Sequence, residues 1–114
     1  MSFFNSDVVR AEMAEISELQ EEIYTNVFKF PTMSLEDKRY HIEILERLVD
    51  KQQVLYTRLS LSDDPEAKKM KDKVLDSAKD LGLPANIDMN IFFKNMNEMV
   101  EVMRREIDNK DSLS

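Results

Sequence analysis

Most of the side chains in this 114-residue chain that could take part in a chemical reaction are carboxylates. Twenty-three residues are Asp or Glu, one is histidine, and none is cysteine. General acid–base catalysis needs a group with a shifted pKa, and nothing in the pattern marks a pair of carboxylates as buried. A single glycine cannot build a phosphate-binding loop, and no Gly-x-Ser-x-Gly or Cys/His arrangement supplies a nucleophile. The sequence therefore predicts a protein that is not an enzyme and holds no cofactor.

The one histidine, His41, is the remaining candidate for metal binding. Its acidic neighbours in sequence, Asp37 and Glu43, do not have the spacing of a helical Glu-x-x-His ligand pair. A second imidazole is missing, which excludes a His-rich zinc site, and no loop recognisable as a carboxylate site for magnesium is present. We therefore expect no metal site, and we expect His41 to be a surface or boundary residue.

Negative charge gathers in the first 30 residues. The formal net charge is −7, and residues 1–30 hold two cations against six carboxylates. Direct nucleic-acid binding needs a basic surface, so it is not expected. The acidic surface permits attraction to a basic protein partner, or it is a solvated face that aids solubility. The candidate partner-binding carboxylates are Glu12, Glu15, Glu18 and Glu22.

Two adjacent phenylalanines, Phe3 and Phe4, precede these carboxylates. Asn5 is the expected N-cap of the first helix, with Phe4 and Val9 as a hydrophobic staple and Asp7 favourably placed in the first turn. Phe3 and Phe4 are then either further partner-binding residues or the contacts that lock the first helix onto the body of the protein.

The elements that must position these side chains are helices. One glycine and three prolines provide little material for turns, and 34% of the residues are charged, which favours an all-α fold. Apolar periodicity and capping residues predict four helices. They cover about residues 6–30, residues 34–61 with Ser34 as cap, a third helix from Asp64-Pro65 to a left-handed Gly82, and a fourth from Asn86 or Asp88 to Asp108.

The first two helices are joined by a short loop, which predicts a long antiparallel hairpin with two shorter helices packed on it. The product is either a small bundle or a helical homodimer. Gln20 and Gln52 interrupt the apolar stripes of the hairpin. Their amides either bond to backbone or water, or they meet across a dimer and set its register. Methionines on the last helix form either core or an interface.

The chain is expected to form a single helical domain over residues 1–108, followed by a disordered tail at 109–114. No signal peptide and no membrane span is recognisable, and cysteine is absent, so a cytoplasmic location is expected.

Three blocks follow one another along the chain: Phe3–Val9, then Ile42–Leu48 with Arg58–Pro65, then Phe92–Met103 followed by Glu106. In these blocks the chain resembles a family of small cyanobacterial proteins, filed as a domain of unknown function, with relatives carried by cyanophages. The first block follows the family pattern of Phe-Phe, Asp or Asn, Ser, an acid and two aliphatics. Asn5 stands where aspartate is commoner.

The resemblance implies a helical, non-catalytic, cytoplasmic protein. The family includes RebA, which binds the catalytic region of RNase E and inhibits RNA cleavage, so RNase E is the implied partner. The resemblance assigns no contact residues. Two other functions remain open: a helical dimeric adaptor or scaffold, and a phage factor that acts on the host RNA polymerase.

Overall fold

The computed structural model describes residues 3–80, 82 and 88–113, and these residues form helices and short connections without a strand. The four α-helices are α1 (Asp7–Asn26), α2 (Leu35–Leu61), α3 (Pro65–Asp80) and α4 (Met89–Leu113). Two 3-10 segments, η1 (Phe3–Asn5) and η2 (Val27–Thr32), precede and follow α1. The predicted all-α fold and helical hairpin are confirmed. No helix in these ranges is long and apolar enough to span a bilayer.

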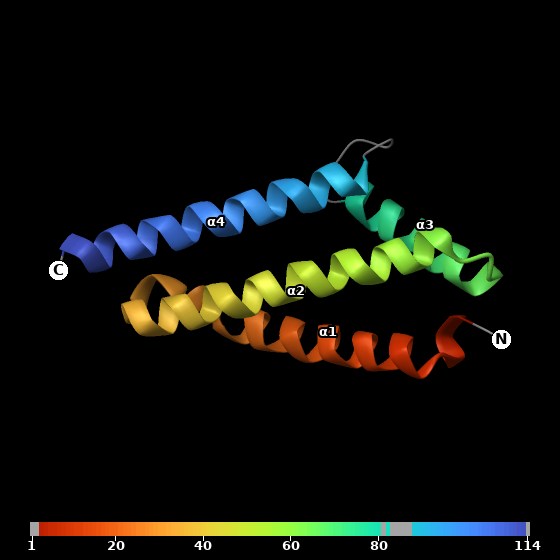
Figure 1. Ribbon diagram of the computed structural model, residues 1–114, viewed down its shortest axis with the longest axis horizontal. Coiled ribbons are helices and arrows are strands. Elements are labelled where there is room, and N and C mark those ends of the chain that lie inside the picture. The colour runs from red at the N-terminus through yellow and green to blue at the C-terminus, as the bar shows by residue number, and fades with distance from the viewer. Residues whose placement is uncertain (1–2, 81, 83–87, 114) are drawn as a thin grey trace.

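Helix α2 is the centre of the molecule (Figure 1). Helices α1 and α4 both run antiparallel to α2 and flank it, while α3 folds back against α2 near η1. The molecule measures 54 × 32 × 20 Å. Since α1 and α4 pack chiefly on α2, grooves remain along the hairpin.

The predicted starts of α2, α3 and α4 are confirmed by side-chain caps. The hydroxyl of Ser34 accepts the Asp37 N–H at 3.1 Å, and Asp64 Oδ1 accepts the Glu66 N–H at 2.8 Å ahead of Pro65. Asp88 Oδ1 accepts the Asn90 N–H at 2.9 Å. Gly82 has a φ of 91°, the left-handed conformation expected of a helix C-cap. Asn86, the other candidate start of the fourth helix, lies outside the described residues.

Helix α1 differs from the prediction at both ends. Its N-cap is Ser6, not Asn5, because the Ser6 hydroxyl accepts the Val9 N–H at 3.4 Å while Asn5 belongs to η1. The α-helix stops at Asn26, and the chain continues as the tighter η2 around Pro31. Proline has no N–H and its ring collides with the carbonyl four residues earlier in an α-helix. The predicted helix over 6–30 is therefore α-helical only to Asn26.

The core consists of three clusters arranged along α2. One joins α1 to α2, one joins α2 to the end of α4, and one joins α2 to α3 and the start of α4. Leu45 packs against all three clusters. On α1 the buried residues are Val9, Ile16, Leu19 and Ile23. Val27, just beyond α1 on η2, is 43% exposed and does not extend this buried face.

Helix α4 continues past Asp108, where the prediction placed its end, and the residues predicted as a disordered tail are helical to Leu113. The Arg39 guanidinium of α2 pairs with Asp108 at 3.1 Å and with Asp111 at 2.8 Å. The Ser112 hydroxyl also donates to the Asp108 carbonyl at 3.0 Å. The two ion pairs hold the last turns of α4 against α2. Met89 is buried on this helix and Met99 is 57% exposed, so its methionines do not share one environment.

Candidate functional site

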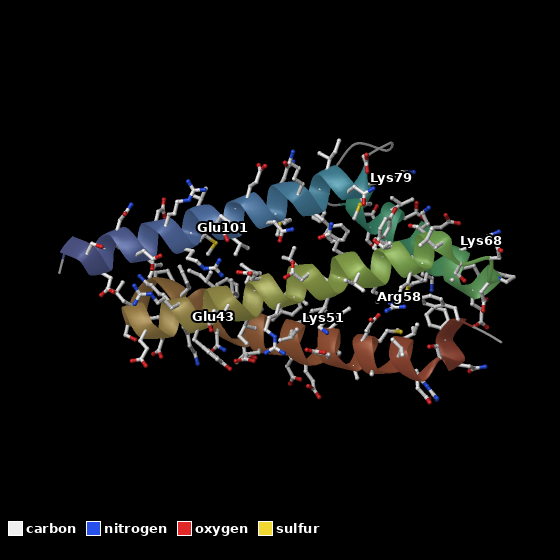
Figure 2. The ribbon with its side chains drawn as sticks, viewed as in Figure 1. Glu43, Lys51, Arg58, Lys68, Lys79 and Glu101 are labelled. Atoms are coloured by element: carbon white, nitrogen blue, oxygen red, sulfur yellow. The ribbon has the colours of Figure 1, made fainter. Side chains whose placement is uncertain are left out.

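The carboxylates on the first half of α1 hold the hairpin together. Glu12 pairs with Arg58 of α2 at 3.2 Å, and only 14% of the Glu12 side chain is exposed. Glu15 pairs with Arg47 at 3.0 Å and with Lys51 at 3.3 Å. Lys51 and Arg58 are labelled in Figure 2 on the side of α2 next to α1. Hydrogen bonding to Lys51 is the main cause that lowers the Glu15 pKa. Two of the four predicted partner-binding glutamates therefore serve the fold.

Glu18 and Glu22 lie on the same face of α1 as Glu15, three and seven residues further along. They line a shallow groove of about 560 Å³ together with Tyr40, Ile44 and Arg47 of α2. Glu18 is exposed and Glu22 is half-buried. Within the described residues neither carboxylate forms an ion pair. Glu22 lies close enough to the Tyr40 hydroxyl to raise the pKa of that tyrosine.

A second cleft, of about 430 Å³, continues from this groove toward the loop of the hairpin. The two share Glu22, Tyr40 and Ile44. The short η2 turn brings the end of α1 beside the start of α2 and so forms the cleft. Its remaining lining residues come from both sides of the turn: Asn26, Lys29, Thr32, Met33, Ser34, Asp37 and His41.

His41 is buried in this cleft, contrary to the predicted surface or boundary position. The residue is 7% exposed, and its ring lies 5.3 Å from the ring of Phe30. Burial lowers the His41 pKa, and the charge of Glu22 opposes that shift in part. The sequence carried a signal for this position, since His41 precedes Leu45 by four residues and Leu48 by seven. That spacing places it on the core side of α2.

Phe3 and Phe4 lie at the opposite end of α1. Their rings meet edge to face, with centroids 5.1 Å apart, and both residues are half-buried. The Phe3 N–H donates to the carboxylate of Asp64, and η1 packs on α3. At 1.5 Å per residue, Phe4 and Glu18 are separated by roughly 20 Å along the helix. The structure therefore does not bring the aromatic and acidic candidates together.

A third groove, of about 460 Å³, opens on another face of the hairpin and is mostly apolar. Gln52 of α2 lines this groove, and so do Ile16 and Tyr24 of α1. Gln20 lies four residues from each of these two α1 residues and therefore on the same face of the helix. Tyr24 at its edge is 68% exposed. The other residues of the groove come from three helices: Leu55, Tyr56, Leu59, Val74, Met89, Phe92 and Phe93.

The groove and the cleft on the acidic face of the hairpin are suited to recognition through charge and hydrogen bonds. In the ranges that the structure describes, no three His, Cys, Asp or Glu side chains lie close enough to hold a metal ion. Glu18 and Glu22 were predicted as partner-binding residues, but Tyr40, His41 and Asp37 were not, because these come from the other helix of the hairpin.

Comparisons with known proteins locate the chain in one family. No curated protein and no solved structure matches it significantly. Residues 1–107 match the family model described as "Domain of unknown function (DUF1825)". The match covers nearly the whole chain and includes α1, α2, α3 and most of α4. The protein therefore belongs to the DUF1825 family.

Proposed function

We propose that this protein is a non-catalytic inhibitor that binds the catalytic region of RNase E and prevents RNA cleavage. The observation that carries the proposal is the pair Glu18 and Glu22, whose carboxylates line a groove on the hairpin without an ion-pair partner among the described residues. The sequence resemblance to the family of RebA names the partner, and the family description itself assigns no function.

The physical basis of the proposal is charge complementarity. A ribonuclease must hold RNA on a basic surface, and this chain has a net charge of −7. Glu18 and Glu22 are about 6 Å apart along the helix axis, and α1 is fixed to α2 by the ion pairs of Glu12 and Glu15. A rigid acidic face of this kind could occupy the RNA-binding surface, with the charges acting mainly on association rate and orientation.

The test is an RNA-cleavage assay with the purified catalytic region of RNase E and increasing amounts of this protein. The wild-type chain should inhibit, and inhibition should weaken as salt rises because exposed charges are screened. The double variant Glu18→Lys/Glu22→Lys should require about tenfold more protein for the same inhibition. Glu15 is left unchanged, since its reversal would place like charges beside Arg47 and Lys51.

A matched control carries the same change in net charge elsewhere. Asp50→Lys/Asp72→Lys alters two exposed carboxylates, on α2 and α3, that line neither acidic cavity. This control should inhibit nearly as well as wild type. If both double variants lose inhibition equally, the loss depends on net charge and not on the position of Glu18 and Glu22. An absence of inhibition by the wild-type protein at low salt would refute the proposal.

A second candidate function, a homodimeric adaptor, is favoured by the apolar groove that contains Gln52. A second copy could cover Tyr24 and bring the glutamines of the two chains together. Light scattering distinguishes the two states, because a dimer has twice the 13.4 kDa mass of the chain. A stable dimer that has no effect on RNase E would favour this adaptor function, whereas a monomer at micromolar concentration would exclude it.

A further inference from the structure

The cleft at the loop end of the hairpin brings together two carboxylates from different helices. Glu22 comes from the last turns of α1 and Asp37 from the first turn of α2. In the described part of the chain neither side chain has an ion-pair partner. Lys29 also lines the cleft, but it is exposed and pairs with neither carboxylate. The cleft therefore has negative charge that the protein itself does not neutralise.

An independent observation concerns His41. This residue is 7% exposed and its side chain lines the same cleft. Within the described residues its ring nitrogens have no hydrogen-bond partner, and its only ring contact is with Phe30. The ring nitrogens are not among the fully enclosed side-chain atoms that lack a partner, so they open into the cleft. A largely buried polar side chain whose free nitrogens face a cleft marks a position where a ligand can supply a hydrogen-bond partner.

The geometry points to this cleft as a receptor for the guanidinium group of an arginine side chain on the partner protein. A guanidinium is planar, permanently charged and presents five N–H donors in a fixed arrangement. Glu22 and Asp37 can accept charge-assisted hydrogen bonds, and the neutral imidazole of His41 can accept one more. Ile44 in the wall of the cleft offers apolar contact for the methylene stem of the arginine.

The inference rests on the proposed function, because the RNA-binding surface of a nuclease is the source of such an arginine. An anionic ligand is disfavoured by the two carboxylates. A lysine would supply charge without the fixed arrangement of donors, so the cleft should distinguish the two side chains.

The experiment is an NMR titration of the full-length, 15N-labelled protein with N-acetyl-arginine methylamide, alongside the corresponding lysine compound. Arginine-induced shifts should be confined to residues around the cleft and include the His41 ring. The apparent affinity should exceed that for the lysine compound by about fivefold. Glu22→Gln and Asp37→Asn should each weaken arginine binding. Asp50→Asn, which changes an exposed carboxylate outside the cleft, should leave it unchanged.

Asp37 is exposed, so Asp37→Asn tests the cleft even where Glu22→Gln disturbs folding. The inference is overturned by an absence of shifts at the cleft, by equal responses to the two compounds, or by equal weakening in Asp50→Asn. If the protein inhibits RNase E but its cleft does not bind arginine, the proposed function is retained and only the arginine site is refuted. If the cleft binds arginine but the protein does not bind RNase E, the proposed function is refuted and the arginine site is retained.

Discussion

The two halves of α1 carry the same acidic residue type and use it differently. Glu12 and Glu15 face cations of α2 and are tied into ion pairs. Glu18 and Glu22, one and two turns further along, face Tyr40 and Ile44 instead. The first half of the acidic face therefore stabilises the hairpin, and the second half lines an open groove.

The difference arises on α2 and not on α1. Cations are also present near the start of α2, but their side chains point elsewhere. Arg39 reaches Asp108 and Asp111 of α4, and the Lys38 ammonium lies 5.5 Å from the centre of the Phe30 ring. The direction in which each cation of α2 points decides which glutamates of α1 are neutralised. The number of cations in α2 does not decide it.

The largest expected effect is the loss of stability when Glu12 is reversed. Glu12→Lys places a cation beside Arg58 in a site where only 14% of the glutamate side chain is exposed. We expect a loss of about 2 kcal/mol in the free energy of unfolding. Glu18→Lys, in the other half of α1, should change it by less than about 0.5 kcal/mol. Urea unfolding followed by circular dichroism measures both.

The charge-swapped double variant Glu12→Lys/Arg58→Glu is the control, and it should recover much of the lost stability. No recovery would mean that the pair does not stabilise the hairpin. An equal loss from Glu18→Lys would remove the distinction between the two halves of α1.

A smaller effect is expected from acid titration of His41. Burial lowers its pKa in the folded state below the ordinary 6.5, so the unfolded chain binds more protons near that pH. Stability should therefore fall as pH drops through 6.5 toward the lower folded pKa. Charged and titratable groups around the ring are Glu22, Asp37, Tyr40, Lys29 and Lys38.

Urea midpoints between pH 7.5 and 5.5 measure this slope, a range chosen to lie above the ordinary carboxyl pKa values. His41→Gln should flatten the dependence. A His41→Gln variant that retains the wild-type slope would assign the effect to other groups.

Glu15→Gln should cause a still smaller loss of stability, because the ion pairs of Glu15 with Arg47 and Lys51 are partly exposed and are weakened by solvent. The Glu15 pKa is lowered from 4.5, so its stabilisation is present above that pH and is lost as pH falls below it. The loss in the variant should shrink at high salt and below pH 4. A loss that does not respond to salt would indicate packing instead of charge.

The smallest effect concerns the tyrosine beside Glu22. Hydrogen bonding to Glu22, and then the negative charge of that carboxylate, raises the Tyr40 pKa above its ordinary 10. Glu22→Gln should therefore lower the Tyr40 pKa without loss of fold. Alkaline titration by ultraviolet absorbance, in a background with Tyr24 and Tyr56 changed to Phe, measures it. An unchanged Tyr40 pKa would mean that Glu22 does not influence the ionisation of the tyrosine.

Local signals predicted most of the helical framework. The caps at Ser34, Asp64 and Asp88 and the left-handed Gly82 follow from chemistry that involves only neighbouring residues. The antiparallel hairpin follows from its short loop. The end of α1 was missed because the Pro31 turn tightens the chain well before the proline itself, and the end of α4 because its last turns depend on Arg39 of a distant helix.

The candidate site was predicted only in part for the same reason. Glu18 and Glu22 share a helical face, which the spacing alone shows. The burial of His41, the approach of Tyr40 and the convergence of Glu22 with Asp37 depend on how α1 and α2 are aligned. The placement of Phe3 beside Asp64 likewise joins residues 61 positions apart.

The sequence by itself determined the helical class, the hairpin, the caps and the acidic face of the first helix, because each depends on residues within a few positions of one another. Only the tertiary structure decided which glutamates are neutralised and which line an open groove. That outcome depends on the rotation and register of α2 against α1, since a rotation of either helix would turn different cations toward the same carboxylates.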